Sequence, residues 1–292
     1  MPSDVDLPIL RLMTRADLPV ADRLRAQAGW NQTAEDWERF LSGAPEGCFV
    51  MEAASRVVGT ATTLCYGQDL AWIGMVLVDP DHRRRGLGKA LLRHCLEQLQ
   101  SRGVACIKLD ATPMGRPLYA ALGFQDEWPQ TRWGTDGAPV VERTGEDGGD
   151  VRQLRHEDWP ALLDLDRPAF GVDRAHVLQA LVQHGSQVLV RVRQDGALCG
   201  YGMIRPGSRA RYLGPLVASD QDTATALARS LMIRAKGEAI YWDIPDRNAE
   251  TVQLARDWGL TAQRSLMRMH CGPNRHPGDP SWIHGIVAPE TG

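Results

Sequence analysis

An internal repeat is the feature of this sequence that most constrains its fold. The segments RLMTRADLPVADRL (11–24) and RQLRHEDWPALLDL (152–165) share one layout, a strand end followed by a helix. The matched positions, all 140 or 141 residues apart, are Arg11 with Arg152, Asp17 with Asp158, Gly59 with Gly200 and Gly74 with Gly214. An offset that holds at separated places is typical of a duplicated unit. The chain is therefore expected to contain two copies of one scaffold.

The expected boundary between the copies is a polar linker. The 292-residue length suits two domains of ordinary size. The segment GTDGAPVVERTGEDGGD (134–150) is rich in Gly, Asp and Glu, which is typical of a connection outside the packed core. We therefore predict a first domain at 1–137, a linker at 138–150 and a second domain at 151–292.

Composition excludes several classes of protein. With 43% hydrophobic and 24% charged residues, the chain is typical of a water-soluble globular protein. A net charge of −3 gives no overall basic field, so no nucleic-acid partner is expected. No apolar run reaches the roughly 18 residues of a membrane span, so no membrane partner is expected either. The beginning, MPSDVDLPIL, lacks a signal-peptide pattern, and the six cysteines form no CxxC pair. These features predict a cytoplasmic protein with reduced thiols.

Hydrophobic patterns in the first half predict alternating strands and helices. The run LAWIGMVLV (70–78) is continuously apolar, as in a strand that is buried on both faces. Leu87, Leu91, Cys95 and Leu99 recur every four residues, as on the buried face of a helix. The expected strands lie at about 7–13, 47–54, 57–66, 70–78 and 105–111, and the expected helices at about 15–28, 33–43, 86–102 and 115–123. This order predicts an α/β fold with helices packed on a central sheet.

The loop DHRRRGLGKALL (81–92) precedes one of these helices and has the composition of a phosphate site. A Walker A loop is excluded, because Ala90 follows Gly88-Lys89 where that loop needs Ser or Thr. A dinucleotide fingerprint is excluded, because its third glycine would be Leu91. What remains is Arg83-x-x-Gly86-x-Gly88 between a strand and a helix.

Backbone amides at such a helix start favour anions. The two glycines leave the amides accessible, and Arg84, Arg85 and Lys89 add positive charge. We expect this loop to hold two adjacent phosphates, such as the pyrophosphate of coenzyme A. The alternative is a glycine turn with solvated arginines.

The run VDPDHRRRGLGKALL, followed by LYAALGF, closely resembles the GNAT superfamily of acyl-CoA-dependent N-acyltransferases. The resemblance covers about residues 8–135. The paired layout also resembles two-domain GNAT proteins, in which a degenerate copy follows an active domain. It implies an α/β (α+β) fold of tandem GNAT-like domains, each with a mixed, mostly antiparallel central sheet flanked by helices.

The resemblance also implies roles for individual residues. Val76, Leu77 and Val78 would bind the pantetheine arm through their backbone, and the amide of Leu77 or Val78 would donate to the oxyanion. The residues implied to wrap the pyrophosphate are Arg83, Arg84, Arg85, Gly86, Leu87, Gly88 and Lys89. Tyr119 takes the place of the general acid, and a phenol of pKa about 10 could protonate the thiolate.

Asp110 is the candidate general base, at the end of a strand in CIKLDATP. The short segment DATPMGRP departs from many relatives, so a water chain could serve instead, and Asp110 could be a helix cap or a structural acid. His82 is expected to be a surface residue. The histidines show no ligand spacing, so no metal is expected.

The acceptor side is expected in AGWNQTAEDWERF (28–40). Trp30, Asn31 and Gln32 combine an aromatic wall with amide groups, which suits a small polar acceptor. The alternative is that Trp30 and Trp37 are core residues.

The second copy lacks these groups. At the repeat offset its loop is Thr223–Ala228, with no glycine or arginine, and Tyr119 corresponds to Ala255. Asp110 corresponds to Asp243. We expect this copy to be structural, to shape the acceptor pocket or to mediate self-association. The segment SWIHGIVAPETG (281–292) is apolar enough to pack on the protein.

Together these features predict an acetyl-CoA-dependent N-acetyltransferase (EC 2.3.1) with one coenzyme site, acting on a primary amine of a small molecule. The alternatives are a protein lysine or N-terminal acetyltransferase and a non-catalytic acyl-CoA-binding regulatory module. A monomer or homodimer is expected.

Overall fold

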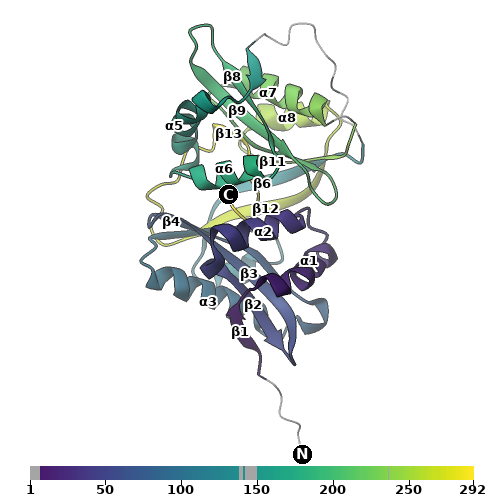
Figure 1. Ribbon diagram of the computed structural model, residues 1–292, viewed down its shortest axis with the longest axis vertical. Helices are drawn as coiled ribbons and strands as arrows, with labels where there is room; N and C mark the ends of the chain where they lie inside the picture. The colour runs from purple at the N-terminus through teal and green to yellow at the C-terminus, as the bar shows by residue number, and fades with distance from the viewer. Residues whose placement is uncertain (1–6, 138–140, 142–149, 236) are drawn as a thin grey trace, which may run out of the picture.

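The computed structural model describes residues 7–137, 141, 150–235 and 237–292, and shows two similar α/β halves stacked end to end (Figure 1). The first half contains β1 (Ile9–Leu12), α1 (Leu18–Gln27), α2 (Ala34–Gly43), β2 (Cys48–Ala53), β3 (Arg56–Tyr66), β4 (Leu70–Val78), α3 (Leu87–Ser101), β5 (Cys106–Ala111), α4 (Arg116–Ala120) and β6 (Gln125–Gly134). The second half contains β7 (Val151–Gln153), α5 (Trp159–Phe170), α6 (Ala175–Gln183), β8 (Gln187–Val192), β9 (Leu198–Arg205), β10 (Arg211–Ala218), α7 (Gln221–Arg234), β11 (Ile240–Pro245), α8 (Ala249–Asp257), β12 (Thr261–Cys271) and β13 (Ile283–Gly285).

The repeat seen in the sequence is a structural repeat. Arg11 forms a bidentate ion pair with Asp17 in the first half, with a shortest N–O distance of 2.8 Å. The equivalent pair in the second half, Arg152 with Asp158, has the same bidentate geometry and a shortest distance of 2.6 Å. Each aspartate also accepts a backbone N–H at the start of a 3₁₀ turn. The predicted duplication is therefore confirmed.

One continuous sheet runs through both halves. Its strand order is β1-β2-β3-β4-β5-β12-β6-β11-β10-β9-β8-β7, with β13 paired to β10. Only β4–β5 and β10–β11 are parallel among the described pairs. The predicted mixed, mostly antiparallel sheet flanked by helices is confirmed.

Two strands are exchanged between the halves at the centre of this sheet (Figure 1). Strand β12 comes late in the chain but lies between β5 and β6, with Met267 opposite Ala111. Strand β6 in turn pairs with β11, with Trp133 opposite Trp242. Neither half therefore completes its sheet alone. The boundaries proposed from the sequence follow chain order and stay a prediction, and most of the 138–150 linker lies outside the described residues.

Buried ion pairs connect the exchanged strands to their neighbours. Arg268 on β12 donates two hydrogen bonds to Asp110 on β5, at 2.9 and 3.0 Å. Arg132 on β6 donates two to Asp243 on β11, at 2.7 and 2.6 Å. All four side chains are at most 5% exposed. Because each pair joins residues from different halves, breaking either one leaves a buried charge at the junction.

The predicted elements of the first half are observed with shifts of a few residues. In α3, Leu87, Leu91, Cys95 and Leu99 are buried against the sheet, as their spacing predicted. The first predicted helix begins as a 3₁₀ turn (Arg15–Asp17) before α1, and α4 is shorter than predicted. None of the helices within the described parts of the chain is both long and apolar enough to cross a bilayer.

The segment that follows β12 packs on the protein, as expected from its composition. Ile283, Ile286 and Val287 are each at most 4% exposed. Strand β13 pairs with β10, and the chain then reaches the junction of the two halves, where Figure 1 marks its end beside α6. This segment contacts both copies of the scaffold.

We predict that Asp110→Asn destabilises the whole chain, because it leaves the Arg268 guanidinium buried without its carboxylate. The expected loss is about 3–5 kcal/mol in the free energy of unfolding. Both halves should unfold in one transition, which denaturant titration followed by circular dichroism would measure. Glu46→Gln, at the exposed Arg102–Glu46 pair, is the control and should change little. An Asp110→Asn midpoint equal to that of wild type would contradict this account.

Candidate active site

A cleft opens where β4 and β5 diverge. The two strands pair in parallel only from Leu70–Cys106 to Trp72–Lys108. Beyond this point the sheet splits, and a cleft of about 1070 Å³ lies between the strand ends and α3. A volume of this size can hold a large ligand.

A bulge in β4 bends the strand at the cleft. Met75 and Val76 of β4 lie opposite one residue of β3, since Thr60 pairs with Leu77 and Thr62 with Gly74. Met75 has a φ of 50°, and its carbonyl accepts a hydrogen bond of 2.8 Å from Thr60 Oγ1. A bulge of this kind redirects backbone groups. Val76, Leu77 and Val78 line the cleft where β4 has no partner on its β5 side among the described strands, so their edge N–H and C=O groups can bind a ligand there.

The phosphate-loop candidate lies at one end of this cleft. Gly86 is the N-cap of α3 with a φ of 80°, and no side chain caps the helix. A Cβ placed on Gly86 would have no described atom within 4 Å, so the space before the first turn is open. The first amides of α3 therefore have no side-chain cap among the described residues and lie next to open space, a geometry in which a helix start can bind an anion.

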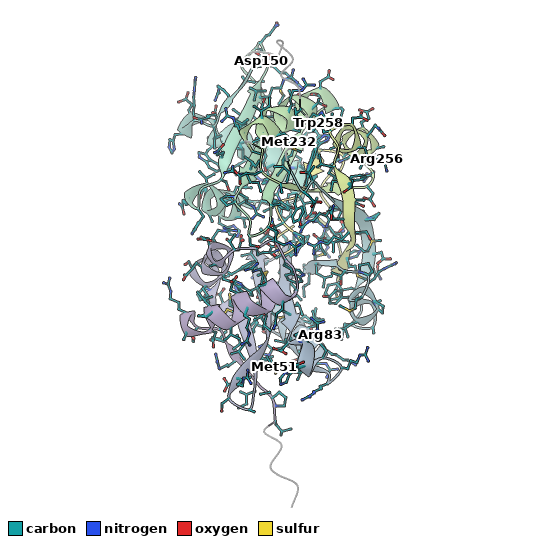
Figure 2. All side chains as sticks on the ribbon, turned by 90° about the vertical axis from the view of Figure 1, so that its right-hand side faces the viewer. Met51, Arg83, Asp150, Met232, Arg256 and Trp258 are labelled. Atoms are coloured by element: carbon teal, nitrogen blue, oxygen red, sulfur yellow. The ribbon has the colours of Figure 1, made fainter. Side chains whose placement is uncertain are left out.

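Positive side chains surround this helix start. Arg83 Nε donates to the Val78 carbonyl at 3.1 Å, which ties the loop to the end of β4. The other lining residues of the loop are Arg84, Gly86, Leu87, Gly88, Lys89 and His82. Arg85 is exposed and is not among the lining residues. Figure 2 places Arg83 in the first half, far from Arg256 and Trp258 in the second.

Tyr119 reaches the cleft from α4. Its ring occupies the space beside Gly115, where a Cβ would lie 2.9 Å from a ring carbon. Its hydroxyl has no hydrogen-bond partner among the described residues, and burial raises the pKa of Tyr119 to about 12. The phenol is therefore protonated at neutral pH and can donate.

Asp110 lines the cleft but is already paired. Both of its oxygens accept from Arg268, and its side chain is fully buried. This burial raises the pKa of Asp110, although Arg268 opposes the shift. Its role as a base stays a prediction, and its geometry favours the structural alternative.

The three predicted acceptor residues separate in the structure. Trp30 and Gln32 line the cleft, whereas Asn31 points to the second half. Asn31 Nδ2 donates to the Ala210 carbonyl at 2.9 Å, and Asn31 Oδ1 accepts from the amides of Arg209 and Ala210 at 3.0 Å. Asn31 is thus satisfied by the loop before β10, and Trp37 is a core residue with no exposed surface.

Residues of the second half also line the cleft, and sequence analysis did not identify them as site residues. Arg264 and Leu266 belong to β12, and Pro289 and Glu290 belong to the segment after β13. Arg264 and Leu266 reach the first half because β12 is exchanged, and contacts with first-half residues hold Pro289 and Glu290 there. No local pattern marks them. The expectation that the second copy shapes the acceptor pocket is thus consistent with the lining.

The equivalent opening of the second half is filled by the chain itself. Strands β10 and β11 diverge after Leu213 and Trp242, and β13 pairs with β10 in that space. At the start of α7 the Asp220 carboxylate accepts from the Thr223 amide at 2.8 Å, where the first half has an open glycine cap. A carboxylate at a helix start repels a second anion. Ala255, the counterpart of Tyr119, is buried on α8.

Comparison with protein families yields a match in each half. The model described as "Acetyltransferase (GNAT) family" matches residues 17–124, and "Acetyltransferase (GNAT) domain" matches residues 162–285. The first match includes the first-half residues that line the open cleft, and the second includes the strands of its filled counterpart.

Two related proteins and one solved structure are also similar to this chain. The chain is 27% identical over 227 residues to the uncharacterized N-acetyltransferase YitH of Bacillus subtilis, covering 77% of this chain and 78% of that protein. It is 31% identical over 119 residues to the ribosomal protein bS18-alanine N-acetyltransferase of Escherichia coli, covering 38% of this chain and 76% of that protein. The crystal structure of a putative acetyltransferase from Pyrococcus horikoshii has a TM-score of 0.83 and 25% identity, covering 98% of this chain and 96% of that one. The similarity therefore includes the arrangement of the two halves.

Proposed function

Because the chain belongs to the GNAT family of acetyltransferases, as a tandem of two GNAT domains, we propose that it transfers an acetyl group from acetyl-CoA to the primary amine of a small molecule. The observation that carries the proposal is that an uncapped, open helix start and a protonated tyrosine without a hydrogen-bond partner among the described residues share one cleft. The helix start would bind the phosphates of the coenzyme, and the tyrosine would protonate its departing thiolate.

The coenzyme fits the cleft by charge and by shape. The uncapped start of α3, with Arg83, Arg84 and Lys89, would hold the pyrophosphate. The free edge of β4 at Val76–Val78 would hydrogen-bond the pantetheine arm as a neighbouring strand does. The backbone amide of Leu77 or Val78 is then the candidate donor to the thioester oxygen as it gains charge.

In the proposed reaction the amine nitrogen attacks the thioester carbon, so that a C–N bond forms and the C–S bond breaks. The thiolate of coenzyme A takes the proton of the Tyr119 hydroxyl, and the nitrogen loses one proton, which later restores the phenol through solvent. The products are an N-acetyl amide and free coenzyme A. An alkyl amine of pKa about 10.4 costs roughly 4.6 kcal/mol to deprotonate at pH 7, so the acceptor site must favour the neutral amine.

The acceptor end of the cleft favours a small molecule. Gln32 and Glu290, which line it, are 7% and 4% exposed, and Glu290 is contributed by the second half. Such enclosed groups suit a compact amine better than a folded protein surface. The second candidate is a protein N-terminus, favoured by the similarity to the bS18-alanine acetyltransferase.

A screen of acceptors tests the proposal directly. Free thiol would be measured after acetyl-CoA is mixed with amino acids, amino sugars, alkyl amines and peptides that have free N-termini. Thiol release that depends on a small amine is expected. Turnover confined to peptides would favour the second candidate, and no turnover at all would contradict the proposed reaction.

We predict that Gly86→Asp abolishes acetyl-CoA binding, because it places bulk and negative charge before the α3 amides. Calorimetry would measure the change in Kd. Gly103→Asp is the matched control, since Gly103 at the other end of α3 has a similar φ of 76° and equally open surroundings. Unchanged binding by the Gly86 variant would exclude this loop as the phosphate site.

We predict that Tyr119→Phe lowers kcat at least tenfold, or about 1.4 kcal/mol, with little change in the Kd of acetyl-CoA. The reason is that the variant keeps the ring but loses the proton donor. Tyr241→Phe, on β11 outside the cleft lining, is the control and should retain full activity. A Tyr119→Phe enzyme with wild-type kcat would remove the tyrosine from the mechanism.

A further inference from the structure

One segment of the second half enters the cleft of the first. After β13 it crosses the junction, where donors from both halves fix its backbone carbonyls. Arg205 donates to Val287 at 3.0 Å, and Trp72 Nε1 donates to Pro289 at 2.9 Å. The Tyr66 hydroxyl donates to Thr291 at 2.5 Å. The position of Glu290, between the last two contacts, is therefore fixed.

A glycine in the bulged strand makes room for this residue. A Cβ on Gly74 would lie 2.7 Å from the Glu290 Cβ and carbonyl oxygen, closer than such atoms approach. Gly214, which matches Gly74 in the repeat, is likewise packed against this segment, since a Cβ there would lie 2.1 Å from the Ile286 carbonyl oxygen. The segment thus lies against the equivalent strand in each half, and in the first half it presents a carboxylate.

Only one oxygen of the Glu290 carboxylate accepts a hydrogen bond from a described residue. Its Oε2 accepts from Gln32 Nε2 at 2.6 Å, and the described residues offer it no second hydrogen bond or ion pair. Gln32 Oε1 is buried and also has no hydrogen-bond partner. Buried polar atoms are nearly always paired, so the unpartnered Gln32 Oε1 beside the cleft indicates an absent donor, and the second Glu290 oxygen is available beside it. An amine supplies N–H donors for both oxygens.

Asp110, the other carboxylate among the described lining residues, is less suited than Glu290 to receive the amine. Both Asp110 oxygens accept from Arg268, and the side chain has no exposed surface. Using Asp110 as a proton acceptor would weaken the ion pair that joins β12 to β5. Glu290 can accept a proton without breaking any ion pair among the residues that the structure describes.

Glu290 also lies near the charges of three arginines, of which Arg39 is paired with Asp36 and Arg132 with Asp243. It interacts electrostatically with Arg39, Arg132 and Arg264, which come from α2, β6 and β12. Burial lowers the pKa of Arg264, and the charge of Glu290 opposes that shift. Removing the charge of Glu290 therefore also changes the electrostatics of the junction. A test with Glu290 variants needs a control for folding.

We propose that Glu290 is the carboxylate that receives the acceptor's amine, with Gln32 as its partner; this rests on the proposed function. Glu290 and the Gln32 carbonyl oxygen orient the amine by accepting hydrogen bonds from its N–H groups. As the C–N bond forms, the nitrogen becomes more acidic and its proton moves to Glu290, which releases it to solvent. The acetyl group is transferred to the nitrogen, and the departing thiolate takes the proton of Tyr119, as in the reaction proposed above. The second domain thereby supplies a catalytic residue to the first.

The test compares wild type, Glu290→Gln and Glu290→Asp. The acceptor is whichever amine of the screened panel wild type acetylates fastest. Glu290→Gln should lower kcat/KM for that amine at least tenfold, while calorimetry gives an acetyl-CoA Kd within twofold of wild type. Glu290→Asp keeps the charge and should recover part of the rate. Glu250→Gln, an exposed change on α8, is the matched control and should behave as wild type.

Each result of this test either supports or contradicts the proposed role of Glu290. Loss of amine turnover with intact acetyl-CoA binding supports the proposal. Wild-type kinetics in Glu290→Gln overturn it while leaving the proposed function in place. Loss of acetyl-CoA binding in that variant assigns Glu290 to the coenzyme groove and also overturns it. No amine turnover by wild type overturns the proposed function itself.

Discussion

The exchange of β6 and β12 is the constraint on which the rest of the structure depends. Because β12 lies beside β5, the two copies share one sheet, and Arg268 is close enough to neutralise Asp110. The same exchange brings Arg264 into the cleft of the first half, and the segment after β13 also crosses the junction to reach it. The two copies therefore share one sheet, and the cleft is lined by both.

The two copies show how one scaffold can be open or closed. In each, a parallel strand pair diverges next to a helix start. In the second half β13 fills the opening, and Asp220 caps the helix. In the first half the opening is free, and Gly86 leaves the helix start uncapped. A strand of the chain thus takes the place in one copy that we assign to pantetheine in the other.

The sequence predicted what depends on local pattern. The duplication, the elements of the first half up to α4 and the glycine at the start of α3 follow from periodicity and spacing, whereas strand β6 was not predicted. The strand exchange could not be predicted, because β6 and β12 suit either position in the sheet by hydrophobic pattern. Asn31 has the composition of a pocket residue, but its hydrogen bonds go to the loop before β10. Glu290 carries no local signal, since only tertiary packing against Gly74 brings it to the cleft.

We propose that the tandem has one coenzyme site, built in the first half and completed by the second. The stoichiometry of acetyl-CoA binding tests this most directly. Isothermal titration calorimetry of the full chain should give one acetyl-CoA per chain. Two molecules bound per chain would contradict the account, because the opening between β10 and β11 would then have to exchange its own strand for the coenzyme.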